Sequence, residues 1–420
     1  MKKILVVISS VICFQGFSQA DTVQYRVSGR KNTPENSTKP YVILISADGF
    51  RHDYARKYNA VNLLKLAEKG VVSKGMIPSY PTNTFPNHYT LVTGMYPSTH
   101  GLIDNSFYDP HRDETYNMGS WATVADSSWY GGLPLWGLAE KNGMVSASLF
   151  WVASGTRAGG FQPSYYYQYH SEFSNDRKVE IVKEWLQLPE EVRPHLITLY
   201  FPETDSQGHY YGPDSKETET AVLEIDRTVG KLTEEVEKLG LPVNFLFLAD
   251  HGMILSDVDN PMKIPELVNN RRFVVTNSFS LVRIYALNPE QVKPTYRQLR
   301  KEKNKGYKVY LTRRFPKRLH FRTNAHDRLG DILLVPHAPK VFAAVPAPKR
   351  KYPGAHGYDP RKVPDMNAVF QAWGPAFKPA QTIGTFENIH VYPLVAKILG
   401  LPVTHAIDGK EKVLEKILNK

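Results

Sequence analysis

Cysteine is almost absent from the sequence. The single cysteine among its 420 residues is Cys13, which lies within the first twenty positions. That segment is basic at positions 1–3, apolar from position 4 to about 17, and ends in Ser18-Gln19-Ala20, as expected of a secretory signal peptide (1–20) that is cleaved after Ala20. The remaining chain would contain no disulfide, so we expect a core-stabilised protein that is periplasmic in a Gram-negative type of bacterium, or secreted.

Long apolar runs are also missing after position 20, so we expect no membrane span. Positions 21–39 are polar and predict a loosely ordered N-terminal tail. The length of the rest suits one large domain or two smaller ones, and we assign positions 40–420 to a single domain. Within it the hydrophobic pattern weakens, which indicates an inserted subdomain at about 261–348, with short strands such as 279–285.

Acidic residues are too few to balance the basic ones, and the formal net charge is +11. The basic excess is concentrated at positions 297–322. Such a run either attracts a polyanion or forms a solvated insertion. Few aromatic residues alternate with the charges, so we favour the solvated insertion and expect no stable complex with nucleic acid. The sequence indicates no particular oligomeric state.

Continuous apolar runs alternate with helical patterns along the rest of the chain. The runs predict strands at 41–45, 71–77, 144–151, 195–201, 243–248 and 368–372, and the helical patterns fall at 59–69, 216–239 and 389–399. Runs of this kind are typical of strands that are buried on both faces of a parallel sheet. Positions 159–170, rich in tyrosine, read as a loop. The order predicts an α/β fold with a central, mostly parallel sheet flanked by helices.

One stretch joins a hydroxyl group to the start of a helix. Thr84 stands two positions before Pro86, and a helical pattern follows from Asn87 to Gly94. Proline favours the first helical turn, so Thr84 lies at or next to the N-cap, where free N–H groups and the helix dipole favour an anion such as phosphate. Taken alone, Thr84 is more simply explained as a helix cap.

Acidic and imidazole side chains follow three of the predicted strands. They are Asp48, the pair Asp205 and His209, and the pair Asp250 and His251, with His356 in a later glycine-rich loop. Each of these alone is more simply a turn or loop residue. Together they would converge, because ligands of α/β sheets bind beyond the carboxyl ends of the strands.

Mixed aspartate and histidine suit zinc. Two metal ions would clamp a phosphorus centre, with Thr84 as an activated nucleophile and Asn105 as an amide donor to a phosphate oxygen.

These motifs resemble the nucleotide pyrophosphatase/phosphodiesterase family of the alkaline phosphatase superfamily. The resemblance rests on Pro81-Thr-Asn-Thr84-Phe85-Pro86-Asn-His88, on Thr93-Gly94-Met-Tyr-Pro97 and on His100-Gly101-Leu-Ile-Asp-Asn105. It extends to the segment 200–209, to Asp250-His251-Gly252-Met253 and to His356-Gly357-Tyr358-Asp359. It covers most of positions 40–400 and identifies the chain as a bacterial secreted member with an alkaline-phosphatase-like fold.

The resemblance also implies roles for individual residues. One Zn²⁺ would be held by Asp205, His209 and His356, and a second Zn²⁺ by Asp48, Thr84, Asp250 and His251. Thr84 would be the nucleophile and Asn105 the phosphate-binding amide. The aromatic residues Phe85, Tyr166 and Tyr200 resemble those that surround the leaving nucleoside. The sequence departs from the family at Thr204, where a proline is usual, and at Val152-Ala153, where the family has Pro-Gly.

Three functions remain open on this basis. The leading hypothesis is a two-zinc phosphodiesterase or pyrophosphatase that acts on small nucleotides and releases nucleoside 5′-monophosphates through a phospho-threonine. The second keeps this chemistry for choline phosphoesters, lysophospholipids or phosphomonoesters. A phosphomonoester needs more positive charge around its outer oxygens than a diester does. No lysine or arginine lies in the Thr84 and Asn105 motifs, which favours diesters. The third is a secreted binding protein with a silent metal site.

Overall fold

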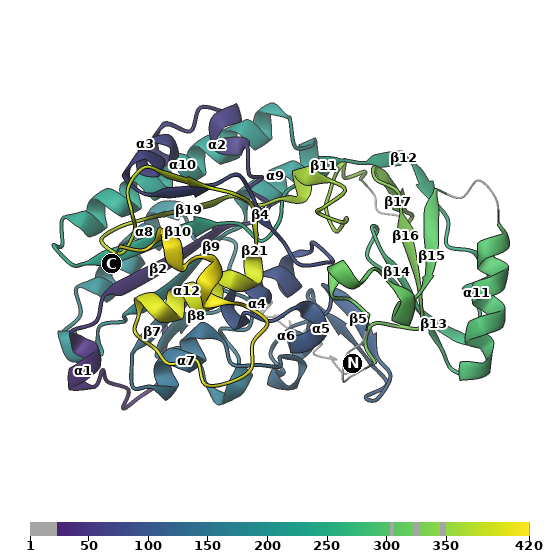
Figure 1. Cartoon of the computed structure of the whole chain (residues 1–420), viewed down its shortest axis with the longest axis horizontal. Helices are drawn as coiled ribbons and strands as arrows, with labels where there is room; N and C mark the ends of the chain where they lie inside the picture. Colours follow the sequence, from purple (N-terminus) through teal and green to yellow (C-terminus); the bar gives the residue numbers. More distant parts are fainter. Residues whose placement is uncertain (1–22, 303–305, 323–326, 345–349, 420) are drawn as a thin grey trace, which may run out of the picture.

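A nine-stranded sheet forms the centre of the molecule (Figure 1). The computed structural model describes residues 23–302, 306–322, 327–344 and 350–419. The predicted signal peptide lies outside these residues. In spatial order the strands are β1 (Tyr25–Arg26), β8 (Tyr165–Tyr167), β7 (Ser146–Leu149), β9 (Leu196–Phe201), β2 (Tyr41–Ala47), β10 (Val243–Leu248), β19 (Phe370–Trp373), β3 (Val71–Ser73) and β20 (Gln381–Ile383).

The strands from β8 to β10 run parallel to one another, whereas β1 is antiparallel to β8 and β19 is antiparallel to β10. Every residue of β2 is buried, as the continuous apolar run predicts. The predicted mostly parallel sheet is therefore confirmed. The loop predicted at 159–170 is wrong in its centre, because Tyr165–Tyr167 pairs with β7 as strand β8. Its three tyrosines are buried, and aromatic side chains favour a pleated, half-covered surface.

Helices cover both faces of this sheet (Figure 1). The long helix α10 (Lys216–Glu237) packs with α3 (Val61–Lys69) and α8 (Asn175–Leu186) on one face. On the other face α12 (Val391–Ile398) packs with α4 (Thr84–Thr93) and α7 (Leu135–Lys141). The apolar stripe predicted for α10 is buried, and Ser215 caps the helix by accepting a hydrogen bond from the N–H of Thr218 at 3.2 Å.

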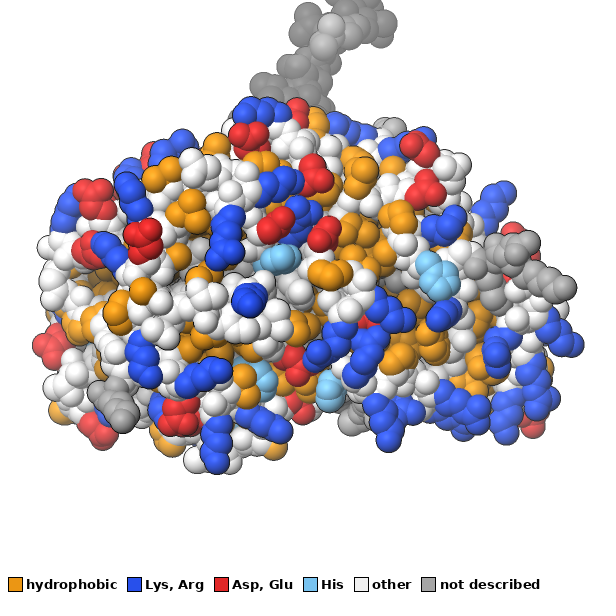
Figure 2. Space-filling view, turned by 45° about the horizontal axis from the view of Figure 1, so that its top comes forward, with side chains coloured by type: hydrophobic (Ala, Val, Ile, Leu, Met, Phe, Trp, Pro, Cys, Tyr) orange, Lys and Arg blue, Asp and Glu red, His pale blue; other side chains and the backbone are white. Residues whose placement is uncertain are grey.

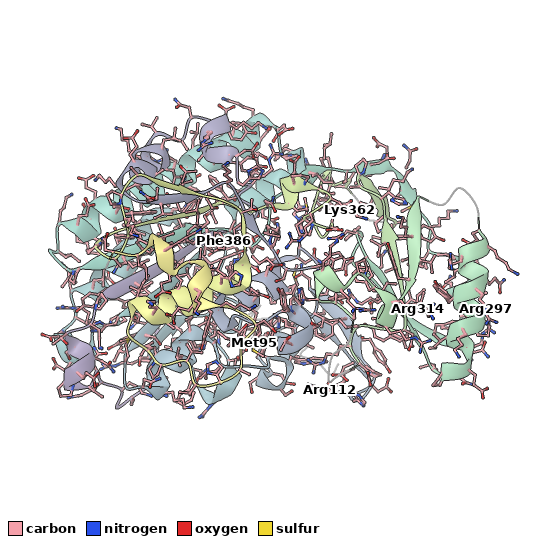
Figure 3. The ribbon with its side chains drawn as sticks, viewed as in Figure 1. Met95, Arg112, Arg297, Arg314, Lys362 and Phe386 are labelled. Carbon is pink, nitrogen blue, oxygen red and sulfur yellow. The ribbon has the colours of Figure 1, made fainter. Side chains whose placement is uncertain are left out.

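A second sheet lies beside the first, within the range predicted as an insertion. It contains β13 (Phe273–Asn277), β14 (Val282–Ala286), β16 (Ile332–Pro336) and β15 (Tyr307–Leu311), and it has a small apolar core shared with α11 (Val292–Lys301). It carries the basic run, so lysine and arginine side chains gather at this end of the molecule (Figure 2). Arg297 on α11 and Arg314 after β15 both lie at this end (Figure 3). Among the described residues, no helix is long and apolar enough to cross a membrane.

Candidate functional site

The carboxyl ends of three adjacent parallel strands form the floor of the site. Strands β9, β2 and β10 are neighbours, and Ser46 of β2 lies opposite both Tyr200 of β9 and Leu248 of β10. The residues that follow these strands therefore emerge at one level of one sheet edge. Asp48 follows β2 there, and Asp250 follows β10.

The helix α9 (Glu203–Tyr211) begins directly after β9 and holds the first cluster. Asp205 and His209 are one helical turn apart, so their side chains share a face of α9, and Asp205 Oδ1 lies 3.4 Å from His209 Nε2. His356 enters from the chain just after β18 (Gly354–Ala355), and its Nε2 lies 3.0 Å from His209 Nε2 and 3.8 Å from Asp205 Oδ1.

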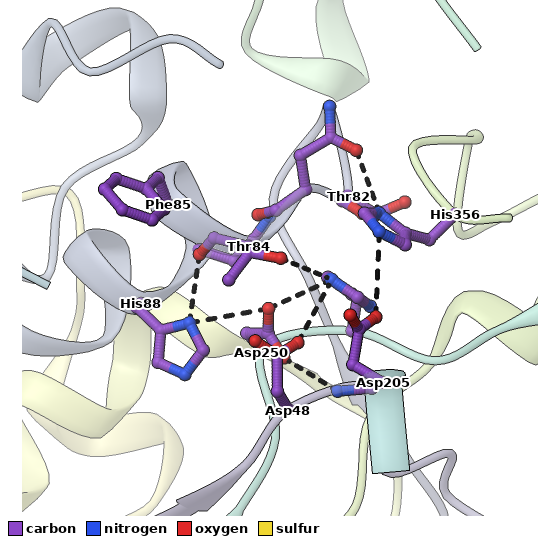
Figure 4. Close-up of polar contacts among 12 residues, drawn as sticks. Asp48, Thr82, Thr84, Phe85, His88, Asp205, Asp250 and His356 are labelled. Carbon is purple, nitrogen blue, oxygen red and sulfur yellow. Dashed lines mark hydrogen bonds and ion pairs between the residues drawn. The ribbon is translucent and has the colours of Figure 1, made fainter. Parts of the chain in front are cut away.

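A second cluster lies beside the first, and Figure 4 labels Asp205 and His356 of the first and Asp48 and Asp250 of the second. His251 Nε2 is 3.0 Å from Asp250 Oδ2 and 3.6 Å from Asp48 Oδ1. The ring of His251 also stacks on that of His356, with their centroids 3.7 Å apart. The predicted ligand residues of both metal ions are therefore brought together, and His251 lies where the two clusters meet.

The tautomers of these histidines suit a cation. His209 Nδ1 faces the carbonyl of Gly354 at 2.9 Å, His356 Nδ1 that of Thr82 at 2.9 Å, and His251 Nδ1 that of Gly252 at 2.9 Å. A carbonyl only accepts, so each Nδ1 carries the proton and each Nε2 presents a lone pair to the cluster.

The carboxylates at the site leave buried oxygen atoms without a hydrogen-bond donor. These atoms are Asp48 Oδ1, Asp205 Oδ1 and Asp250 Oδ2. Lone pairs and carboxylate oxygens that face each other at these distances repel, unless a positive ion lies among them. The residues therefore fit divalent metal ions, and their mixed nitrogen and oxygen donors are those that zinc accepts.

Burial and mutual repulsion perturb the titration of the clustered groups. Burial and the neighbouring charge of Asp205 raise the pKa of Asp48 well above its usual value. Burial and the charges of Asp48 and Asp205 do the same to the pKa of Asp250, and burial raises the pKa of Asp205 to about 7. Burial lowers the pKa of His251 to about 3, so this imidazole is neutral. Metal cations would relieve the repulsion among the three carboxyl groups.

Thr84 is the first residue of α4, and Asn83 occupies the N-cap position. Thr84 Oγ1 lies 3.2 Å from His251 Nε2, so the hydroxyl faces the second cluster (Figure 4). The side-chain oxygen of Asn105 accepts a hydrogen bond from the backbone N–H of Phe85 at 2.9 Å. The amide nitrogen of Asn105 therefore points away from this N–H group. Asn105 thus bonds the same end of α4 that carries Thr84.

His88 also belongs to the site, although the sequence alone indicated no role for it. It is fully buried one turn after Thr84, and its Nδ1–H lies 3.0 Å from the carbonyl of Thr84 and 3.4 Å from Asp250 Oδ2. Its Nε2 pairs with Ser46 Oγ at 2.8 Å. His88 thus bonds the first residue of α4 and lies beside a carboxylate of the second cluster. The spacing of four residues could have shown this, because it places His88 on the same face of α4 as Thr84.

The three aromatic residues of the prediction have different environments. Phe85 is half-buried, with its ring 6.4 Å from that of Tyr116. The hydroxyl of Tyr200 donates to Asp48 Oδ2 at 2.6 Å, so this residue orients a predicted ligand. Tyr166 is buried in β8 and stacks on Tyr25 at 5.1 Å, away from an open surface. Its role in substrate binding stays a prediction.

Tyr169, for which the sequence predicted a loop position and no role, is an exposed aromatic side chain of this region. It is 54% exposed, and its ring lies 6.0 Å from that of Tyr200. The sequence could not show which tyrosine of this segment is exposed, because four tyrosines occur within five positions.

One departure from the family pattern has a structural consequence. Thr204 stands where a proline is usual, and its hydroxyl donates a hydrogen bond to the backbone carbonyl of Asp48. This contact attaches the start of α9 to the end of β2. Close packing at the same point leaves little space, since a Cβ added at Gly49, whose φ is +66°, would lie 3.0 Å from Asp205 Cα.

Comparison with known proteins identifies the family. A family model described as type I phosphodiesterase / nucleotide pyrophosphatase matches residues 42–359. The chain belongs to this family. The matched range includes Thr84, Asn105 and all six aspartate and histidine side chains of the two clusters, which confirms the resemblance seen in the motifs.

Relatives within the family include animal enzymes of greater length. Mouse ectonucleotide pyrophosphatase/phosphodiesterase family member 1 is 34% identical over 406 residues, which cover 92% of this chain and 44% of the relative. Venom phosphodiesterase 2 of Crotalus adamanteus is 35% identical over 387 residues, covering 89% of this chain and 47% of the relative. The chain therefore spans less than half the length of these relatives.

The fold is also found among solved structures of the family. Human ectonucleotide pyrophosphatase/phosphodiesterase 5 superposes with a TM-score of 0.83 and 26% identity, covering 90% of this chain and 100% of that one. The murine protein of the same name gives a TM-score of 0.82 at 25% identity. The predicted alkaline-phosphatase-like fold is confirmed.

Proposed function

We propose that this chain is a two-zinc phosphodiesterase and nucleotide pyrophosphatase that releases nucleoside 5′-monophosphates. The observation that carries the proposal is the position of the Thr84 hydroxyl, 3.2 Å from His251 Nε2 and at a helix N-terminus beside two clusters of aspartate and histidine. Relatives named as nucleotide pyrophosphatases and venom phosphodiesterases support the choice of a nucleotide.

In this proposal Asp205, His209 and His356 hold one Zn²⁺, while Asp48, Thr84, Asp250 and His251 hold the other. Bound zinc supplies positive charge to the phosphate oxygens and lowers the pKa of the Thr84 hydroxyl. Thr84 Oγ attacks phosphorus in line, a phospho-threonine forms and the bond to the leaving group breaks. Water then cleaves the phospho-threonine and releases the 5′-monophosphate.

The other residues bind and orient the substrate. The amide nitrogen of Asn105 donates to a non-bridging phosphate oxygen, because its oxygen is held by the N–H of Phe85. Phe85 and the exposed Tyr169 offer ring faces to the base. Among the described residues, no lysine or arginine forms an ion pair or hydrogen bond with Asn105 or Thr84, which favours a diester over a monoester. We further propose a periplasmic or secreted location.

Two chromogenic esters at equal concentration test the proposal, with added zinc and then with EDTA. One is the p-nitrophenyl ester of thymidine 5′-monophosphate, a diester, and the other is p-nitrophenyl phosphate, a monoester. We expect a strong preference for the diester that EDTA abolishes and zinc restores. Preference for the monoester would point to a phosphatase, and no turnover of either ester would revive the choline-ester and silent-site hypotheses.

Substitution of Thr84 tests the nucleophile separately. Thr84→Ala should lower kcat for the diester by about 10³-fold or more, while metal analysis still finds the zinc content of the wild-type protein. Thr84→Ser keeps a hydroxyl and should retain part of the activity. Near-normal turnover in Thr84→Ala would show that another group attacks phosphorus.

A further inference from the structure

One buried carboxylate outside the metal clusters contacts several parts of the site at once. Asp104 is fully buried and precedes Asn105 in the chain. Its Oδ1 accepts hydrogen bonds from Asn83 Nδ2 at 2.6 Å and from the backbone N–H of Asn105 at 2.7 Å. Asp104 therefore bonds the N-cap residue of the nucleophile helix and the residue proposed to bind phosphate.

The other oxygen of Asp104 faces the second sheet. Asp104 Oδ2 accepts from Arg283 Nη1 at 2.5 Å and from Ser278 Oγ at 2.6 Å. Arg283 lies on β14 and is also fully buried. Each oxygen thus accepts two hydrogen bonds, and the two charges are paired within a buried region that joins the two sheets.

The contacts of Asn83 extend this network to a predicted metal ligand. Asn83 Oδ1 accepts from His356 Nδ1 at 3.0 Å, and its Nδ2 donates to Asp104. The orientation of the Asn83 amide is therefore set by Asp104, because a carboxylate can only accept. With the amide so turned, Asn83 presents an oxygen to His356 Nδ1, which also faces the carbonyl of Thr82. The two acceptors together hold the ring with Nε2 toward the cluster.

Close packing also restricts the loop that carries His356. Gly357, next to His356, has φ +96°, and a Cβ there would lie 1.9 Å from Ser280 Oγ and 2.8 Å from Asn83 Oδ1. The turn between β13 and β14, which holds Ser278 and Ser280, therefore presses against the His356 loop. A shift of this turn would move the loop and the Asn83 side chain together.

We propose that Asp104 and its counter-ion Arg283 form a positioning pair that aligns Asn105 and, through Asn83, His356. The inference rests on the proposed function for its kinetic readout, but its metal-binding readout does not. Through Arg283, the inserted sheet becomes part of the scaffold of the active site. Asp104 touches neither the predicted metal ions' ligands nor the substrate-binding amide directly, so it is a positioning residue and not a catalytic one.

Asp104→Asn tests the proposal, because the variant places an amide donor against Arg283 and Ser278 or against Asn83 and Asn105. We expect the affinity for zinc, measured by competition with a chromogenic chelator, to fall about 10-fold or more. The ratio kcat/KM for the thymidine diester should fall about 10–100-fold, with much of the change in kcat, since Asn105 and His356 are both misaligned.

A second buried ion pair provides a matched control. Asp109 Oδ2 and Arg328 Nε are 2.7 Å apart, and the two side chains are almost as buried as Asp104 and Arg283. The pair joins β5 (Ser106–Asp109) to the inserted region, but neither residue bonds Asn83, Asn105 or His356. Asp109→Asn removes the counter-ion of a buried arginine, as Asp104→Asn does. The two variants should therefore lose similar thermal stability. Zinc affinity and kcat/KM should stay within about 3-fold of the wild type.

The outcomes separate the two proposals. Equal zinc affinity and equal kinetics in Asp104→Asn and Asp109→Asn would overturn the positioning role. If the wild type hydrolyses no diester, the proposed function fails, and the zinc affinities still decide the positioning role. If Asp104→Asn does not fold, Ser278→Ala tests the positioning role instead, because it removes one hydrogen-bond donor from Asp104. Several-fold weaker zinc binding in Ser278→Ala would support the role, and unchanged zinc binding would overturn it.

Discussion

The closest backbone contact at the first cluster predicts a severe effect from one methyl group. Gly354 lies in β18, and a Cβ added to it would lie 2.1 Å from the carbonyl oxygen of Gly208 and 3.0 Å from His209 Cα. Ordinary contact begins at 3.4 Å, so in Gly354→Ala the strand β18 and the helix α9 must separate by about 1 Å. The change therefore acts on the helix that carries Asp205 and His209.

The size of the effect follows from the bond that such a separation breaks. The Nδ1–H of His209 donates to the carbonyl of Gly354 at 2.9 Å and fixes the ring with Nε2 toward the cluster. Loss of a hydrogen bond behind a ligand typically lowers metal affinity 10–100-fold, or about 1.4–2.7 kcal/mol. Overpacking adds a stability cost of about 1–3 kcal/mol.

Chelator competition for zinc, thermal unfolding and diester turnover would measure these effects. Gly384→Ala is the matched control, because a Cβ at Gly384 meets no atom within 4 Å and its φ is not in the left-handed region. We expect Gly384→Ala to match the wild type in all three assays. Wild-type zinc affinity in a folded Gly354→Ala protein would refute the claim that the Gly354 carbonyl orients His209.

Two further predictions concern an ion pair and an aromatic residue. Burial raises the pKa of Asp109, but the hydrogen bond and charge of Arg328 outweigh it and hold the pKa below its usual value. The pair should therefore stabilise the fold above the unfolded-state pKa of about 3.9 and lose this effect as the pH falls through the lower folded-state pKa. Urea unfolding should show a difference between wild type and Asp109→Asn that shrinks below pH ~4; a constant difference would contradict the ionic contribution. Tyr169→Ala should raise KM for the thymidine diester several-fold with little change in thermal stability, whereas Tyr166→Ala should mainly lower stability. The reverse pattern would assign base stacking to Tyr166, as the sequence predicts.

Much of the fold could be predicted because its signals are local. The apolar run that forms β2 and the 3.6-residue pattern of α10 each lie within a short segment, and both elements occur where they were expected. Pro86 and the pattern after it placed Thr84 at a helix start, and α4 begins at Thr84. Segment 165–167 was missed, because strand pairing with β7 decides its state and aromatic content alone does not.

The sequence by itself determined the chemistry of the site, since the types of its acidic, imidazole and hydroxyl residues and their places after strands can be read from the chain. Only the tertiary structure decided how these groups are oriented. The oxygen that Asn83 presents to His356 depends on Asp104, which is paired with Arg283 179 positions away. Contacts of this kind leave no periodic trace in the sequence, because they depend on which strands become neighbours and on how closely their loops pack.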